Sequence, residues 1–330
     1  MSIATNPTRR GSALITATKK YATEDRRQSW WHFWSTLGAL VVSWILTCLD
    51  MPWPLRATAT LVTGLILVRL FIIYHDYLHG TILSGSRLAK AILAGYGLLA
   101  LSPCSVWKRT HDHHHKNNTK VFGAGIGTYP LMTTTTYANA PWRKRAGYAM
   151  ARHPLTILLG YLTVFLYGMC IRPLLADARH HFDVVLALVI QLGIIVALAL
   201  TAPYLLIWTF PGPLLIASAV GAYLFFAQHN FPGMQMQSGA DWDYVFAALN
   251  SSSFIAMNPI MHWFTGNIGY HHVHHLNAHI PFYRLPEAMA AITELQSPKT
   301  TSLSPVAIYS CLRLKLWNSQ KSCLVTFSGL

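Results

Sequence analysis

Charged residues are scarce in this sequence. Aspartate, glutamate, lysine and arginine together make up 11% of the 330 residues, whereas hydrophobic residues make up 53%. A soluble globular domain usually carries about 25% charged residues. This shortage argues against an ordinary water-exposed surface and predicts that much of the protein surface lies in lipid.

Acidic residues are the scarcest group. There are 11 of them against 25 lysines and arginines, which gives a net charge of +14. Such a balance also occurs in nucleic-acid-binding proteins, but here the basic residues gather beside apolar segments, as the positive-inside rule predicts for cytoplasmic loops. We therefore expect membrane lipid and no nucleic acid as a partner. The basic residues in question are Arg9, Arg10, Lys19, Lys20, Arg26, Arg27, Arg143, Lys144 and Arg145.

The sequence also lacks cysteine pairs and a signal peptide. Its five cysteines are odd in number and have no CxxC spacing, so we expect free structural thiols. No apolar core follows within the first thirty residues, which argues against a secretory signal. We expect residues 1–29 to form a polar, basic and mobile cytoplasmic arm.

Long apolar runs are abundant. Four of them, residues 30–49, 57–74, 184–200 and 204–226, approach the roughly 20 residues that a membrane-spanning helix needs. Two further runs are ambiguous: 88–101 is short and carries Lys90, and we interpret it as interfacial or re-entrant, whereas 155–171 has the length to span. If the histidine clusters described next share one side of the membrane, an even number of spans separates them, which places 155–171 in the interface.

These segments predict an all-α integral membrane protein. It has about four transmembrane helices, interfacial helices and a cytoplasmic histidine-rich domain. The expected organisation is an arm over 1–29, a membrane domain over 30–296 and a cytoplasmic C-terminal tail over 297–330. The sequence shows no internal repeat.

Histidine is the unusual residue, with 17 copies in clusters. The sequence contains one HxxxH box, two HxxHH boxes and one further histidine before the last box. Positions i, i+3 and i+4 share one face of a helix, so each box aims its imidazoles the same way. The aligned set is His75, His79, His111, His114, His115, His229, His271, His274 and His275, with His113 and His272 as supporting or spacer residues.

Nine imidazoles are too many ligands for one metal ion and suit two ions with four or five ligands each. Imidazole binds iron, zinc, copper and nickel. Two irons make the best chemical sense, because zinc has no redox chemistry. An isolated histidine is more often a packed core residue than a ligand, and we apply that interpretation to His32, His153, His180, His181, His262 and His279.

At these boxes the sequence resembles the membrane fatty acid desaturase family. The family pattern is HxxxH or HxxxxH, then HxxHH, then HxxHH or QxxHH, with an extra histidine before the third box. The resemblance covers residues 68–285, and the runs 263–276 and 280–285 are especially similar to bacterial acyl-lipid desaturases. The first box has three residues between its histidines, and this spacing resembles that of the acyl-lipid desaturases that act at the Δ12 or ω-3 position.

The resemblance implies that the nine histidines hold two non-haem iron ions. It implies an O2-dependent enzyme that introduces a cis double bond into lipid-linked acyl chains, with no catalytic residue beyond the ligands. No HPGG haem-binding signature is present, so the electrons would come from an external ferredoxin or cytochrome b5-type donor. The implied location is a bacterial inner membrane, with the boxes and both termini cytoplasmic.

Several neighbouring residues have two interpretations. Asp76 and Asp112 lie inside the boxes and either support ligand imidazoles or are solvated carboxylates. Lys108 and Arg109 either contact headgroups or an acidic electron donor, or are ordinary cytoplasmic charge. Acyl-CoA members of the family carry an asparagine that holds a metal-bound water; here Phe225 takes that position, and Asn230 and Asn267 are the candidate substitutes.

Two alternative functions remain at this point. A lipid or carotenoid hydroxylase or ketolase of the same superfamily would use almost the same ligands. A metal transporter or membrane metal sensor would need ionisable residues along its spans, and the predicted spans are almost uncharged apart from Arg69.

Overall fold

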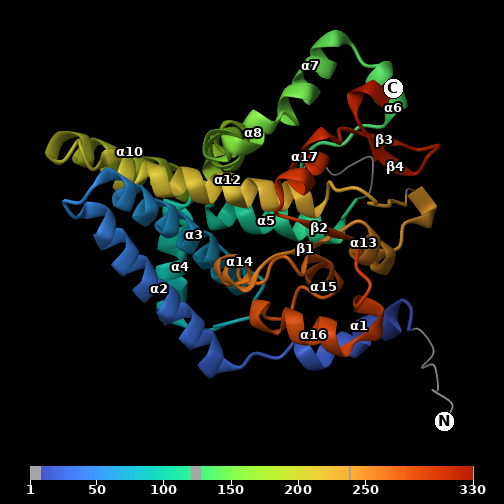
Figure 1. Cartoon of the computed structure of the whole chain (residues 1–330), viewed down its shortest axis with the longest axis horizontal. Coiled ribbons are helices and arrows are strands. Elements are labelled where there is room, and N and C mark those ends of the chain that lie inside the picture. The colour runs from blue at the N-terminus through green and yellow to red at the C-terminus, as the bar shows by residue number, and fades with distance from the viewer. Residues whose placement is uncertain (1–8, 120–127, 238, 330) are drawn as a thin grey trace.

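The computed structural model describes residues 9–119, 128–237 and 239–329, and within them the protein is mainly helical, with four short strands (Figure 1). Four stretches of helix are long and apolar enough to cross a membrane: α2 (Arg26–Cys48), α3 (Trp53–Leu78), α10 (Phe182–Thr201) and Leu206–Gln228. The last comprises α11 (Leu206–Thr209) and α12 (Pro211–Gln228). The predicted all-α membrane fold with four spanning helices is confirmed.

Local sequence explains where the first two helices begin. The Asp25 side chain accepts hydrogen bonds from the backbone N–H groups of Arg27 and Gln28 and so caps α2. A proline occupies the first turn of α3, where its missing N–H costs no hydrogen bond. α3 extends four residues beyond the predicted end at residue 74, so His75 lies inside the helix.

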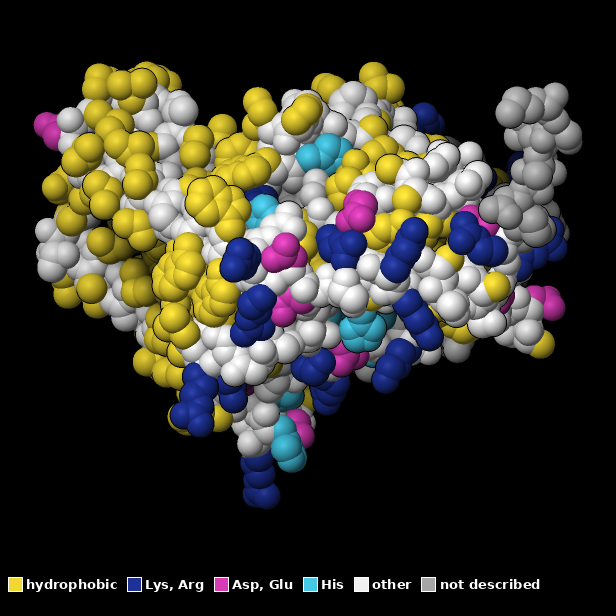
Figure 2. All heavy atoms as spheres, turned by 90° about the horizontal axis from the view of Figure 1, so that it is seen from below, with side chains coloured by type: hydrophobic (Ala, Val, Ile, Leu, Met, Phe, Trp, Pro, Cys, Tyr) yellow, Lys and Arg dark blue, Asp and Glu magenta, His cyan; other side chains and the backbone are white. Residues whose placement is uncertain are grey.

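α3 is the interior helix of the membrane region. In its most apolar window 67% of the residues are buried, against 17% in α10, which therefore presents most of its surface to lipid. α3 packs tightly on α12, since a Cβ atom on Gly64 would lie 2.7 Å from Cγ2 of Ile216. On the face in Figure 2, hydrophobic side chains gather at the end formed by α2, α3 and α10, and lysine and arginine lie toward the other half.

The two ambiguous apolar runs do not form straight long helices. α4 (Arg87–Leu99) and α5 (Cys104–Lys116) meet at an angle of 89°, the geometry of a broken span or of a re-entrant pair, and the placement of 88–101 remains a prediction. The second run is divided into α8 (Pro154–Leu158) and a continuous helix over Tyr161–Ala176, which begins as a π-helix (Tyr161–Ile171) and ends as α9 (Arg172–Ala176). Its placement in the interface remains a prediction.

The amino-terminal arm is packed against the protein from Arg9 onward, so the expectation of a mobile arm is wrong for residues 9–25. α1 (Ser12–Thr18) and the 3-10 turn Lys19–Tyr21 bury Leu14 and Tyr21. Arg9 pairs with Glu294 at 2.9 Å. Leu14 and Tyr21 belong to the main hydrophobic core, which docks the segment.

The remaining elements are short. They are α6 (Thr134–Ala138), α7 (Trp142–Ala151), the 3-10 turn Ala178–His180, the turn Gly239–Asp241, α13 (Tyr244–Asn250), β1 (Phe254–Ala256), α14 (Pro259–Phe264), α15 (His271–Leu276), the turn Phe282–Arg284, α16 (Leu285–Ala291), the turn Thr293–Leu295, β2 (Thr300–Ser302), α17 (Pro305–Arg313), β3 (Leu316–Asn318), β4 (Cys323–Val325) and the turn Phe327–Gly329. β1 pairs with β2 in parallel and β3 with β4 antiparallel. The C-terminal segment thus packs onto the membrane domain.

Candidate metal centre

Four separate parts of the chain bring the nine aligned histidines together. They come from the end of α3, from α5, from the residue after α12 and from α15. Their ring nitrogens form two groups, and within each group the atoms lie within 4.8 Å of one another. The five-histidine cluster is His75, His79, His111, His115 and His274; the four-histidine cluster is His114, His229, His271 and His275.

The spacing of the nitrogens fits a metal ion in each cluster. In the five-histidine cluster, successive Nε2 atoms of His75, His111, His115 and His274 lie 2.9, 3.0 and 3.1 Å apart. In the four-histidine cluster, Nε2 of His229 lies 3.0 Å from that of His114 and 2.9 Å from that of His271. Two nitrogens bound at right angles to a metal at about 2.1 Å are about 3.0 Å apart.

Histidine nitrogens without a hydrogen-bond partner also indicate a metal ion in each cluster. Nε2 of His79 and Nε2 of His275 are buried and have no hydrogen-bond partner among the described residues. Buried polar atoms in native proteins nearly always have a partner. One metal ion in each cluster would supply it.

The imidazoles near the carboxyl end of the chain are held in the form that binds metals. Burial lowers the pKa of His229 to about 4. Burial, and then the neighbouring histidines, lower the pKa values of His271, His274 and His275 well below the ordinary value. Neutral imidazole is the species that coordinates a metal, so these rings need no deprotonation near pH 7.

Asp76 supports a histidine of the five-histidine cluster. One carboxylate oxygen accepts a hydrogen bond from Nδ1 of His75 at 2.9 Å, and the other accepts from the backbone N–H of Phe282 at 2.7 Å. This leaves Nε2 of His75 facing the cluster. Asp112 instead pairs with Lys108 at 3.1 Å, and its side chain is 39% exposed, so it is a solvated carboxylate.

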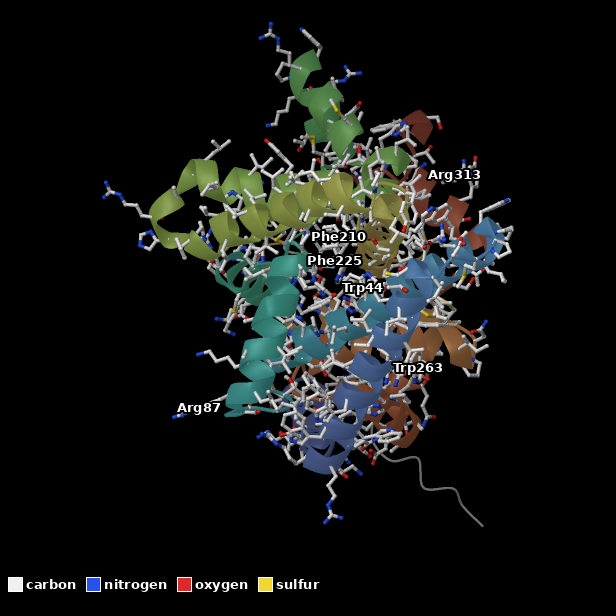
Figure 3. The ribbon with its side chains drawn as sticks, turned by 90° about the vertical axis from the view of Figure 1, so that its left-hand side faces the viewer. Trp44, Arg87, Phe210, Phe225, Trp263 and Arg313 are labelled. Carbon is white, nitrogen blue, oxygen red and sulfur yellow. The ribbon has the colours of Figure 1, made fainter. Side chains whose placement is uncertain are left out.

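Aromatic rings flank both clusters. Trp107 stacks on His111 with ring centroids 4.2 Å apart. Phe225, labelled in Figure 3, is a half-buried residue of α12, and its ring centroid is 5.1 Å from that of His114. The sequence drew attention to Phe225 only as a departure from the family pattern. Its edge-on contact with His114 was missed, as was the stacking of Trp107 on His111.

The two asparagines considered as substitutes at the Phe225 position are used elsewhere. The Asn230 side chain accepts from Arg152 and donates to the carbonyl oxygen of Cys311. Asn267 donates to the carbonyl oxygen of Phe282. Neither asparagine forms a hydrogen bond with a histidine of the two clusters among the described residues, and the residue that would hold a metal-bound water stays a prediction.

The histidines assigned to ordinary packing lie outside both clusters. His32 contacts Arg69, His153 caps α8, His180 pairs with Asp177 and His181 bonds Ser105. His262 lies beside the rings of Phe254 and Tyr270, and His279 follows α15 in a turn. Of the two histidines interpreted as supporting or spacer residues, His272 contacts the Leu295 carbonyl oxygen and His113 contacts Asn117.

Comparison with known proteins agrees with this arrangement. The model of the fatty acid desaturase family matches residues 51–303, a range that contains all nine histidines. The chain belongs to the fatty acid desaturase family. It is 29% identical over 284 residues to a fatty acid desaturase of Bacillus subtilis (strain 168), covering 86% of this chain and 80% of that relative. The family assignment makes the chain a desaturase, an oxidoreductase, and argues against a transporter or sensor.

Proposed function

We propose that each histidine cluster binds one iron ion and that the resulting di-iron centre introduces a cis double bond into lipid-linked acyl chains. The observation that carries the proposal is the division of nine buried or half-buried histidines into two groups whose ring nitrogens have metal-binding spacing. The family match supports the substrate class.

The reaction needs an oxidant because methylene C–H bonds have no useful acidity. Two iron ions that react with O2 supply that oxidising power when bound. For each double bond, two hydrogens leave adjacent methylenes, and O2 takes four electrons and four protons in becoming two waters. Two of the electrons come from the acyl chain and two from an external ferredoxin or cytochrome b5-type donor.

The protein's own residues bind and position the metals and keep water away. Asp76 fixes the orientation of His75 and leaves its Nε2 free for a metal. The Trp107 and Phe225 rings pack against His111 and His114. A water-poor site protects a reactive oxidant from side reactions.

The proposed location is a bacterial inner membrane, with the histidines and both termini on the cytoplasmic side. The packing of the amino-terminal segment and of the C-terminal strands onto the histidine-bearing end supports a common side for all of them. The exposed basic residues of α7 agree with the positive-inside rule.

Expression in a host that lacks polyunsaturated lipids but supplies a ferredoxin tests the proposal. Fatty acid methyl esters from the wild type are compared by gas chromatography–mass spectrometry with those from a His271→Ala, His275→Ala variant. His180→Ala is the matched control, because that exposed histidine pairs only with Asp177. We expect a new double bond, placed at the Δ12 or ω-3 position, in the wild type and the control alone.

Iron analysis of the purified proteins completes the test. We expect two iron ions per chain in the wild type. Hydroxylated lipid in place of a double bond would move the assignment to the hydroxylase branch. A folded wild-type chain that binds no iron would overturn the di-iron proposal.

A further inference from the structure

Two cationic side chains are buried without a carboxylate at the junction of α7 and α8. Arg152 is 2% exposed and Lys315 is 8% exposed. Neither forms an ion pair with an aspartate or glutamate of the described residues. Buried charges are normally paired, so an anion from outside the chain would complete this region.

Arg152 is hydrogen-bonded by the protein, whereas Lys315 is only partly so. The guanidinium of Arg152 donates to the carbonyl oxygens of Pro130 and Leu314 and to the side chain of Asn230. Nζ of Lys315 donates one hydrogen bond, 2.5 Å long, to the Arg152 carbonyl oxygen. An ammonium group has three N–H donors, so two remain for a ligand.

Lys315 lines a surface cavity of about 560 Å³. Most other lining residues are apolar, among them Met150, Leu155 and Phe327, and Lys315 is the one lysine or arginine among the described residues of its wall. Burial, and then Arg152, lower the pKa of Lys315 to about 8, which leaves it mainly protonated at pH 7. A cavity with one cation and apolar walls suits a ligand with an anionic head and a hydrocarbon tail.

His153 adds a second donor at the same cavity. Its Nδ1 accepts a hydrogen bond from the backbone N–H of Leu155. In the neutral ring the proton then lies on Nε2. His153 is exposed, so this donor is available to a ligand beside Lys315.

The first turn of α7 carries positive charge in an unfavourable place. Arg143, Lys144 and Arg145 are all exposed, and the turn contains no acidic residue. Cations at a helix N-terminus are disfavoured by the helix dipole. An anionic surface beside α7 would offset this cost, and the neighbouring Trp142, 71% exposed, is the residue type that favours a membrane interface.

The cavity continues into lipid-facing surface. Leu155 is part of its wall, and Leu158, Leu159 and Leu162 follow it as exposed hydrophobic residues. Figure 1 shows α7 projecting from the body of the molecule, with α8 leading back toward α12. This apolar continuity favours a lipid over an acidic protein as the ligand.

We propose that the cavity binds the anionic headgroup of a membrane phospholipid. Its phosphate contacts Lys315 and His153, its acyl chains lie along Leu155 and Leu158, and the first turn of α7 contacts neighbouring anionic headgroups. This inference goes beyond the proposed function and does not depend on iron or turnover. It is tested by binding alone, so its failure is distinguishable from failure of desaturation.

Lipid retention by the purified full-length protein tests the proposal. The protein in neutral detergent is titrated with dioleoyl phosphatidylglycerol or dioleoyl phosphatidylcholine, and bound lipid is counted by native mass spectrometry. We expect preference for phosphatidylglycerol, an affinity about tenfold lower in Lys315→Met because a charge-assisted hydrogen bond is lost, and recovery in Lys315→Arg. Lys321→Gln removes an exposed charge from the same C-terminal hairpin and should change little.

A second variant tests the proposal independently if Lys315→Met does not fold. Arg143→Gln, Lys144→Gln, Arg145→Gln alters only exposed side chains of α7 and should reduce the preference for phosphatidylglycerol severalfold. Equal retention of both lipids by the wild type would overturn the proposal, as would equal losses in Lys315→Met and Lys321→Gln.

Two further outcomes would reassign the site. Displacement of phosphatidylglycerol by millimolar inorganic phosphate would show a free-phosphate site with no need for acyl chains. Loss of binding to an acidic ferredoxin in Lys315→Met, with lipid retention unchanged, would assign the surface to a protein partner.

Discussion

The two histidine clusters are built from different kinds of structure. The five-histidine cluster takes two members from the last turn of the interior helix α3, and a buried carboxylate, Asp76, supports one of them. The four-histidine cluster takes His229 from the position directly after α12, and the backbone carbonyl oxygen of Ser251, 3.0 Å from Nδ1, supports its ring. Among the described residues no carboxylate contacts a ring of the second cluster.

This difference implies that the two metals are not equivalent. A carboxylate that accepts from a ligand imidazole raises the basicity of that imidazole and fixes its tautomer more strongly than a carbonyl oxygen does. The five-histidine cluster also has one more ligand. We therefore expect it to hold its metal more tightly than the four-histidine cluster.

Removing one ligand from each cluster is the strongest test of this comparison. We expect His111→Ala and His271→Ala each to abolish desaturation, because both metals are needed. His271→Ala should lose its metal almost completely, whereas His111→Ala retains four ligands in its cluster and should keep part of its metal. The iron content per chain, measured on variants with unchanged helix content, distinguishes the two substitutions. Equal losses of iron in both variants would contradict the expected difference in metal affinity between the clusters.

Removal of the Asp76 carboxylate should have a smaller effect on metal binding than removal of a ligand, and one limited to the five-histidine cluster. Asp76→Asn should weaken metal binding in the five-histidine cluster by about 10- to 100-fold, the usual effect of losing such a supporting group. Asp112→Asn is the matched control, because Asp112 lies in a histidine box but pairs with Lys108 at the surface. Metal release followed with an iron chelator measures both, and a comparable loss in Asp112→Asn would contradict the role of Asp76.

The membrane helices and the nine histidines were predictable from the sequence because each depends on a local pattern. Apolar length predicts a span, and the i, i+3, i+4 spacing predicts a shared face. The N-terminal segment was misjudged because its docking depends on a distant partner: Arg9 meets Glu294, and Thr18 meets Asn277. The uses of Asn230 and Asn267 likewise depend on contacts that local sequence does not contain.

The partition of the histidines follows a rule that sequence analysis missed. In both HxxHH boxes the i and i+4 histidines share one cluster and the i+3 histidine joins the other. At 3.6 residues per turn, position i+4 lies about 40° from i, whereas i+3 lies about 60° away on the opposite side. Helix geometry alone thus predicts the division within each box, but which box faces which cluster depends on how α3, α5 and α15 meet.

Replacement of the aromatic rings beside the clusters should give the smallest loss of metal affinity. It tests whether ring packing also differs between the two clusters. Trp107 stacks on His111 of the five-histidine cluster, and Phe225 contacts His114 of the four-histidine cluster. An aromatic pair contributes about 0.5–1.5 kcal/mol beyond its buried area, so Trp107→Leu and Phe225→Leu should each lower metal affinity about threefold to tenfold. We expect each loss to be confined to the adjacent cluster, since the other cluster keeps its own ring. Iron retention at limiting metal checks this, and a loss shared equally by both clusters would mean that the rings stabilise the fold as a whole rather than individual imidazoles.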